Sequence, residues 1–179
     1  MGGIISKCIN RKKRSVVFIG AAGSGKTSLI LGFKGNQETS AGTVTIYEQS
    51  LIRGNGYTID LFDLSGNQDH TQFWKFYTEH SHLVVFIVDI SSKESVQQSK
   101  DVFEAFYTSY AIQKDNIIFL LNKIDLVPEE ARNELVSLFH SEFMSVVGMK
   151  KGNTQRVMTT SAGVRSQEVF KFVCKSIDQ

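Results

Sequence analysis

The segment from residue 15 to residue 34 restricts the possible folds of this chain more than any other part of it. Residues 15–20 (SVVFIG) form a continuous apolar run, which is typical of a strand buried in a parallel sheet. Residues 26–34 are a helix candidate. The turn between them matches G-x-x-x-x-G-K-[ST], a pattern whose backbone N–H groups wrap around phosphate oxygens. We therefore predict a phosphate-binding loop made by Gly20, Ala21, Ala22, Gly23, Ser24, Gly25, Lys26, Thr27 and Ser28.

The lysine and the threonine at the end of this loop have direct roles beside a phosphate chain. Lys26 can place a positive charge between the β- and γ-phosphates, and the Thr27 hydroxyl can ligate Mg²⁺. The alternative is a glycine-rich turn that binds nothing. The strand candidate before the turn and the helix candidate after it favour the binding loop.

A second polar segment distinguishes guanine from adenine. Asn122, Lys123 and Asp125 stand at the end of the apolar run 116–122. The Asp125 carboxylate can accept hydrogen bonds from the guanine N1–H and exocyclic amine, which adenine does not offer in that arrangement. Lys123 can lay its stem over the base, and Asn122 would brace the loop. After the next strand candidate, Ser161 and Ala162 can offer a backbone N–H to the guanine O6. The alternative is a solvated polar turn. The position of this motif at a strand end, after a phosphate loop, favours guanine binding instead.

A third motif lies between these two. Residues 63–66 supply D-x-x-G at the end of the strand candidate 57–64. Asp63 would hold Mg²⁺ through water, and the Gly66 N–H would contact the γ-phosphate. The tetrapeptide is a weak signal by itself, and its position between the other motifs gives it its value.

The rest of the chain alternates between short apolar runs and longer amphipathic stretches. Further strands are expected at 43–52, 82–90 and 156–160, and a hairpin turn at 53–56, where Asn-Gly accepts positive φ. Helices are expected at 26–34, 92–110, 128–147 and 164–177. This alternation, in 179 residues, predicts one α/β domain with a mostly parallel sheet over residues 15–179.

Together the motifs resemble the small GTPase superfamily over about residues 15–177, and within it the Arf and Arf-like family. The aromatic run Phe73-Trp74-Lys75-Phe76-Tyr77 is similar to that family's second switch segment. The resemblance implies a six-stranded, mostly parallel sheet with helices on both faces. It also implies binding of GTP and GDP with Mg²⁺, hydrolysis of GTP to GDP and phosphate, and a role in membrane trafficking. Exchange factors, activating proteins and effectors would contact the switch segments, with effectors meeting Tyr47, Phe73, Trp74 and Tyr77.

The first switch segment departs from the family. Its Mg²⁺-binding threonine has four candidates, and Thr43 fits best because it lies 16 positions after Thr27 and 20 before Asp63. The family's preceding proline is replaced by Gly42. An ordinary strand threonine is an equally good explanation. The other candidates are Thr39, Ser40 and Thr45.

The catalytic position departs as well. The resembled families follow D-x-x-G with a glutamine that orients the attacking water, and here that position is Asn67. Asn67 is one methylene shorter, while Gln68 has the reach but starts from the wrong side of the loop. We predict very slow intrinsic hydrolysis, dependent on an activating protein. The alternative is a nucleotide-binding interaction module that hardly turns over. A P-loop ATPase or kinase is disfavoured by Asn122 and Asp125.

Charge separates the N-terminus from the rest of the chain. Residues 1–14 hold five basic and no acidic residues, whereas the other 165 hold 15 basic and 18 acidic ones. A mildly acidic body argues against a nucleic-acid binder. The first six residues match the N-myristoylation pattern at Gly2, and Cys8 is a candidate palmitoylation site. We expect residues 1–14 to hold a monomer on the cytosolic face of a membrane. A solvated, inactive N-terminus is the alternative.

Overall fold

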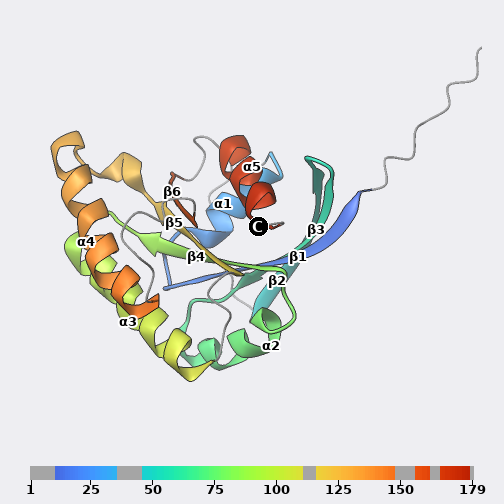
Figure 1. Ribbon diagram of the computed structural model, residues 1–179, viewed down its shortest axis with the longest axis horizontal. Helices are drawn as coiled ribbons and strands as arrows, with labels where there is room; N and C mark the ends of the chain where they lie inside the picture. Colours follow the sequence, from blue (N-terminus) through green and yellow to red (C-terminus); the bar gives the residue numbers. More distant parts are fainter. Residues whose placement is uncertain (1–10, 36–45, 111–115, 148–155, 162–165, 178–179) are drawn as a thin grey trace, which may run out of the picture.

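The computed structural model describes residues 11–35, 46–110, 116–147, 156–161 and 166–177. Within them, six strands form one sheet in the order β2-β3-β1-β4-β5-β6 (Figure 1). Only the β2–β3 pair is antiparallel. The predicted α/β class and its mostly parallel six-stranded sheet are therefore confirmed. The strands are β1 Lys12–Gly20, β2 Tyr47–Gly54, β3 Tyr57–Leu64, β4 Leu83–Asp89, β5 Ile117–Asn122 and β6 Val157–Thr159.

Helices cover both faces of the sheet (Figure 1). Alternate residues of β1 point to opposite faces, so Val16 and Phe18 pack with α1 and α5, while Val17 and Ile19 lie in the cluster formed with α2, α3 and α4. A strand buried on both faces must be apolar at every position, which explains the unbroken runs in the sequence. The helices are α1 Lys26–Phe33, α2 Trp74–Thr78, α3 Lys93–Ser109, α4 Glu129–Val147 and α5 Ser166–Ser176, with short 3₁₀ turns η1 Gln68–Phe73 and η3 Ile124–Leu126.

Most boundaries agree with the sequence predictions, with two informative differences. Strand β1 begins at Lys12 and pairs with Tyr57 of β3, so three basic residues expected in the N-terminal arm belong to the sheet. One of them, Lys13, lies 3.2 Å from the Asp60 carboxylate. The second difference is the η1–α2 segment, which was not predicted. The hairpin turn is confirmed, because Asn55 and Gly56 both have positive φ (47° and 81°).

The parallel arrangement gathers the polar motifs at one edge of the sheet. Strands β1, β4 and β5 run in the same direction, and their ends are aligned by the pairs Gly20–Ile87 and Asp89–Asn122. Ligand sites of open α/β sheets lie outside these carboxyl ends. Within the described ranges, no helix has the length and hydrophobicity needed to cross a bilayer.

Candidate functional site: a phosphate loop beside a guanine-type motif

The loop after β1 depends on glycine at two places. Gly25 has φ 91°, in the left-handed region, and a Cβ atom there would collide with the Asn122 amide. Gly20 has φ 150°, and a Cβ atom would collide with the backbone oxygen of Ile87 on the neighbouring strand. Glycine accepts such backbone angles and such close approach at no steric cost. These two positions bring the loop against the ends of both β4 and β5.

Lys26 is a buried cation inside this loop. It is only 6% exposed, and its Nζ donates to the carbonyl oxygens of Gly20 at 2.9 Å and Ala21 at 2.8 Å. Burial lowers the pKa of Lys26 from 10.5 to about 8, and the negative charge of Asp63 opposes that shift. A buried ammonium surrounded by carbonyl oxygens lacks the full negative charge that would compensate its desolvation. A phosphate group would supply that charge.

Thr27 and Asp63 meet although they are 36 positions apart. The Thr27 hydroxyl donates to Oδ2 of Asp63 at 2.6 Å, and Asp63 is buried at the end of β3. A hydroxyl and a carboxylate are hard oxygen donors, the type that Mg²⁺ prefers. This donor set, beside a loop suited to phosphate, fits a magnesium ion. Ser28, half-buried in the first turn of α1, follows directly.

Gly66 packs against the phosphate loop. A Cβ atom at Gly66 would lie 2.6 Å from the backbone nitrogen of Ala22 and 2.5 Å from the Gly20 oxygen. The backbone of the D-x-x-G segment therefore approaches the loop as closely as the absence of a side chain permits. Because the two backbones are in contact, a movement of one segment would displace the other.

Asn122 joins the guanine-type motif to the phosphate loop. The side chain is fully buried, and its Nδ2 donates to the carbonyl oxygen of Ser24 at 2.8 Å. Its Oδ1 is buried and has no hydrogen-bond partner among the residues that the structure describes. This bond spans 98 positions and fixes the two motifs relative to each other. This hydrogen bond is of the kind expected if Asn122 braces the loop.

The rest of the guanine-type motif lies at the ends of β5 and β6. Lys123 has φ 68°, a left-handed conformation that is uncommon for residues other than glycine. Asp125 is exposed in η3. The Ile124 N–H donates to the Thr160 oxygen at 3.2 Å, which brings the β6 end and the buried Ser161 beside the motif.

Asp89 is a residue of this site that the sequence reasoning missed. Its Oδ2 lies 2.6 Å from Nζ of Lys123, and both side chains are partly buried. The ion pair holds the lysine stem in place at the end of β4. A signal was available, because Asp89 is a carboxylate at the carboxyl end of an otherwise apolar run.

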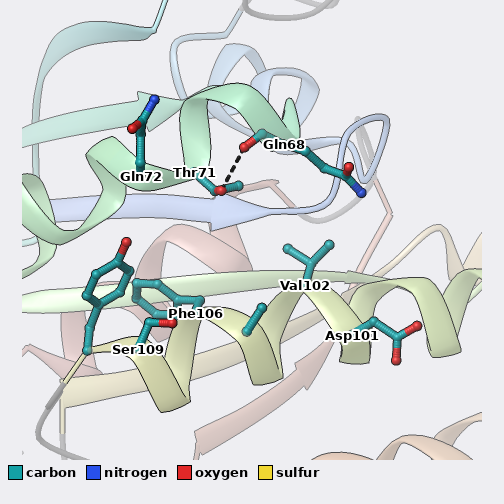
Figure 2. A pocket seen from close by; sticks show the side chains of 9 residues that line it. Gln68, Thr71, Gln72, Asp101, Val102, Phe106 and Ser109 are labelled. Atoms are coloured by element: carbon teal, nitrogen blue, oxygen red, sulfur yellow. Dashed lines mark hydrogen bonds between the residues drawn. The ribbon is translucent and has the colours of Figure 1, made fainter.

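The two candidate catalytic side chains have other surroundings. Asn67 is the N-cap of η1, and its Oδ1 accepts from the Asp69 N–H at 3.1 Å. Its own N–H donates to the Ser65 hydroxyl at 3.3 Å. Gln68 lines a groove between η1 and α3 (Figure 2). The polar end of Asn67 is thus used inside η1.

The aromatic segment divides into buried and exposed members. The expectation that Trp74 faces partners is wrong, because the side chain is 1% exposed and its Nε1 donates to the Ser65 oxygen at 3.0 Å. Its ring packs edge-on against Phe106, with centroids 5.4 Å apart. An indole that fills a gap between helices and has its N–H satisfied gains most by burial. Exposed aromatics of this region are Tyr47, Phe73 and Phe76, and Tyr77 is half-buried.

Tyr77 joins an aromatic cluster that spans the second switch segment and the hairpin. Its ring centroid lies 4.9 Å from that of Tyr47 and 5.5 Å from that of Phe62.

Several predicted site residues cannot be placed, because Thr39, Ser40, Thr43, Thr45, Ala162, Gly2 and Cys8 lie outside the described ranges.

A model of the Arf, or ADP-ribosylation factor, family matches residues 1–176. The chain belongs to the Arf family. The resemblance seen in the motifs is thereby confirmed, and with it a place among small GTPases, whose members bind and hydrolyse GTP. The match covers the phosphate loop, both switch segments and the guanine-type motif.

Individual Arf-family relatives are distant in sequence. The ADP-ribosylation factor-related protein 1 of Bos taurus is 23% identical over 92% of this chain and 86% of its own length. The small COPII coat GTPase SAR1 of Giardia intestinalis is 27% identical over 72% of this chain and 68% of its own. Among solved structures, the Arl6 BBS3 small GTPase of Trypanosoma brucei, bound to the nucleotide analogue GppNp, has a TM-score of 0.72. It is 21% identical, covering 93% of this chain and 98% of that one, and so supports the fold.

Proposed function

We propose that this Arf-family protein is a membrane-anchored switch that binds GTP or GDP with Mg²⁺ at the loop of residues 20–28 and hydrolyses GTP slowly. The observation that carries the proposal is the buried Lys26, enclosed by loop carbonyl oxygens, with a pKa that burial lowers to about 8. Such a lysine is costly in an empty loop and useful beside a phosphate.

The phosphate side of the site uses three side chains. Lys26 would contact the terminal phosphates, while the Thr27 hydroxyl and the Asp63 carboxylate, 2.6 Å apart, would hold the ion directly and through water. Mg²⁺, when bound, would neutralise charge on the phosphate oxygens. Thr43 is the proposed further ligand from the first switch segment. The Gly66 N–H, so close to the loop, would report whether the γ-phosphate is present.

The base side rests on the guanine-type motif. The exposed Asp125 carboxylate is available to accept from the guanine N1–H and amine. Lys123, held by Asp89, would lie along one face of the base. Ser161 and Ala162 would offer a backbone N–H to O6. Asn122 would keep the base segment and the phosphate loop at a fixed separation through its bond to Ser24.

The slow hydrolysis has a local structural argument in its favour. Asn67 is shorter than glutamine, and its side-chain oxygen is already used to cap η1. To orient a water molecule, it would have to give up that hydrogen bond, which costs about 1 kcal/mol at an N-cap. Gln68 makes no side-chain hydrogen bond among the described residues and is the other candidate to place the water.

Partner binding would follow from rearrangement of the switch segments. Loss of the γ-phosphate would release Gly66, and with it the adjacent Ser65, to which Trp74 is bonded. The aromatic surface next to it, formed by Tyr47, Phe73, Phe76 and Tyr77, is the proposed contact for effectors, exchange factors and activating proteins. In this family scheme, the β2–β3 pair within residues 43–63 would slide and release the N-terminal arm.

Membrane attachment rests on the N-terminal sequence. A single myristoyl chain at Gly2 gives only marginal binding, so Cys8 acylation and the basic residues of 7–14, the last three of which lie at the start of β1, would supply the second signal. Each basic residue near an anionic surface adds about 1 kcal/mol. We propose a cytosolic peripheral monomer that acts in membrane trafficking, in line with the coat-GTPase relatives. Sedimentation of the acylated protein with anionic vesicles, and its loss in the Gly2→Ala variant, tests this part.

The central experiment measures nucleotide specificity. Fluorescent GDP and ADP analogues are titrated into nucleotide-free protein with and without Mg²⁺, using wild type, Asp125→Asn and the control Glu130→Gln, an exposed carboxylate on α4. We expect tight GDP binding, no measurable ADP binding, and at least tenfold weaker GDP binding by Asp125→Asn, because a charge-assisted hydrogen bond is worth about 1.5–3 kcal/mol. Equal affinity for both nucleotides would refute a guanine site.

A second candidate function is an interaction module that binds GTP and hardly turns it over. The capping role of Asn67 favours it specifically, since the side chain is part of the η1 structure. Single-turnover assays decide between the two. Product formation that accelerates with an activating protein indicates a cycling switch, whereas a nucleotide that persists for hours indicates the module.

A further inference from the structure

Ser65 is a buried residue of the D-x-x-G segment, and its hydroxyl has no part in the proposed function. The residue is 5% exposed. Its backbone is held on two sides, because its N–H donates to the Ile46 oxygen at 3.0 Å and its carbonyl oxygen accepts from the Trp74 indole at 3.0 Å. Ile46 directly precedes β2, and Trp74 begins α2. The Ser65 hydroxyl therefore has a fixed place between the hairpin and the second switch segment.

The hydroxyl of Ser65 makes a turn with Asn67, two positions later. Its oxygen accepts from the Asn67 N–H at 3.3 Å. A serine oxygen that bonds the N–H two residues further along closes a side-chain turn, which restricts the backbone between them. The residue between them is Gly66, where a Cβ atom would collide with the phosphate loop. The turn therefore sets the direction in which the chain leaves the loop and enters η1.

Asn67 is held at three of its polar groups. Its N–H is bonded to Ser65, and its carbonyl oxygen accepts from the His70 N–H at 2.9 Å. Its side-chain oxygen accepts from the Asp69 N–H at 3.1 Å. The backbone at Asn67 has φ −65° and ψ 133°, the extended conformation usual for an N-cap residue. The side chain at position 67 thus starts from a restrained backbone and is turned into η1.

We propose that Ser65 is a positioning residue for GTP hydrolysis, and that its hydroxyl restrains hydrolysis by holding residue 67 turned into η1. The inference rests on the proposed function, because it concerns the hydrolysis step proposed for this site. A glutamine at position 67 would lose the capping bond, since glutamine is not among the preferred N-cap residues. Its backbone N–H would still be bonded to Ser65. The hydroxyl would then be the remaining restraint that keeps the side-chain amide from the attacking water.

The test is a double-mutant cycle on the single-turnover rate of GTP hydrolysis. Ser65→Ala is combined with the wild-type residue at position 67, with Asn67→Gln and with Asn67→Ala. In the Asn67→Gln background it should raise the rate about tenfold, or about 1.4 kcal/mol, the scale of one hydrogen bond. In the wild-type background the rise should be smaller, about threefold, because asparagine remains one methylene short. In the Asn67→Ala background no amide is released, so the rate should not rise.

Two results of the cycle would overturn the proposal. One is a double variant, Ser65→Ala with Asn67→Gln, that hydrolyses GTP no faster than Asn67→Gln alone. The other is an effect of Ser65→Ala that is the same in all three backgrounds, because the hydroxyl would then act without the side chain at position 67.

Two further substitutions separate the hydroxyl from a general loss of stability. Ser65→Thr keeps the hydroxyl, so in the Asn67→Gln background it should leave the rate within about twofold, and acceleration as large as that by Ser65→Ala would contradict the role of the hydroxyl. Ser92→Ala is the matched control, because the Ser92 hydroxyl also accepts from a backbone N–H, that of Ser95 at 3.1 Å, at the start of α3. It should leave the rate of Asn67→Gln within about twofold. An equal acceleration by Ser92→Ala would overturn the proposal.

Amide hydrogen exchange tests the hydrogen bond itself. In GDP-loaded Ser65→Ala, the Asn67 N–H should exchange about tenfold faster than in wild type. The Trp74 indole N–H is bonded to the backbone oxygen of Ser65, so it should keep its exchange rate and show that the segment is still folded. Unchanged exchange at Asn67, or equal acceleration at both groups, would overturn the specific action on position 67.

The nucleotide content of each variant separates the two levels of inference. The amount of bound GTP is measured by chromatography before hydrolysis is started. Variants that hold GTP but show no acceleration on loss of the hydroxyl refute the role of Ser65 alone. If neither wild type nor any variant holds a guanine nucleotide, the proposed function itself is refuted.

Discussion

The phosphate loop and the switch segment that begins at Gly66 touch each other, yet they are built differently. The loop is fixed by long-range contacts: Asn122 bonds Ser24 from 98 positions away, and Thr27 bonds Asp63 from 36. The switch segment is held mainly by local bonds, such as the Asn67 cap on η1. Long-range bonds between strand ends make a rigid cradle, whereas local bonds permit a segment to change as a unit.

The contrast suggests that nucleotide binding and hydrolysis are separable in this protein. Every side chain proposed to hold the phosphates or the base either lies at a strand end or follows one. The side chains proposed to act in hydrolysis lie on a short 3₁₀ turn, where one of them has a structural bond. Binding is therefore expected to resist changes that alter turnover, and the predictions below test that separation.

The largest effect is expected at Lys26. Lys26→Met removes the charge that would contact the phosphates, and the affinity for GDP should fall about 100-fold, the value of roughly 3 kcal/mol of charge-assisted hydrogen bonding. Titration with a fluorescent GDP analogue measures it. Lys34→Met, at the other end of α1, is the matched control and should change affinity less than twofold. Similar losses in both variants would mean that the loop is not the binding part.

The same lysine gives the rigid region a distinctive pH dependence. Because the folded pKa is about 8 and the unfolded one 10.5, the unfolded chain binds the proton more strongly between these values. The stability of nucleotide-free protein should therefore rise with pH, by about 2 kcal/mol between pH 7 and 9.5. Urea denaturation followed by circular dichroism measures the free energy of unfolding.

The control for this pH effect is Lys26→Met, which should lack the rise. Burial raises the pKa of Tyr107 and of Cys174, but both groups titrate in both proteins, so the difference between the two curves isolates Lys26. Saturating GDP should reduce the rise, because phosphate charge would restore the lysine pKa. Parallel curves for the two proteins would contradict a buried, uncompensated lysine.

Substitutions in the switch segment, in contrast to those at Lys26, should change the rate of GTP hydrolysis more than the affinity for GDP. Asn67→Gln lengthens the side chain by one methylene and should raise the single-turnover GTP hydrolysis rate about tenfold, while GDP affinity changes little. Asn67→Ala removes the η1 cap and should cost about 1 kcal/mol of stability without raising the rate. A rate that is the same in all three proteins would show that Asn67 does not limit hydrolysis and would direct attention to Gln68.

The smallest effect is expected at the ion pair beside the base. Asp89→Asn removes the partner of Lys123 and should weaken GDP binding about fivefold, which is roughly 1 kcal/mol. Glu134→Gln, which breaks the exposed Lys93–Glu134 pair between α3 and α4, is the control and should leave affinity unchanged. If Asp89→Asn bound GDP with unchanged affinity, the ion pair would not contribute to guanine binding.

The parts that could be predicted from the sequence are those encoded by local pattern. The apolar run of residues 15–20, the Asn55-Gly56 turn and the glycines of the phosphate loop each restrict the backbone directly, so the sheet and the loop were expected before the structure. Motif spacing placed Asp63 and Asn122 at strand ends. Their bonds to Thr27 and Ser24 follow from parallel pairing.

The remaining features depend on tertiary contacts that no local pattern carries. The extension of β1 to Lys12 follows from pairing with β3, which overrides the charge of that stretch. The burial of Trp74 depends on a gap beside Phe106, and a sequence with aromatics at 73, 74, 76 and 77 does not tell which of them fills it. Likewise, the ion pair of Asp89 with Lys123 requires that β4 and β5 end side by side.

The buried Trp74 has a practical consequence, because it is the only tryptophan in the chain. Its indole N–H is bonded to the oxygen of Ser65, the residue before Gly66. A movement of Gly66 on loss or gain of the γ-phosphate would therefore change the surroundings of the indole and its fluorescence emission. Exchange of GDP for a GTP analogue can therefore be followed by intrinsic fluorescence in real time. The protein carries its own optical reporter, and no label has to be attached to the surface where partners would bind.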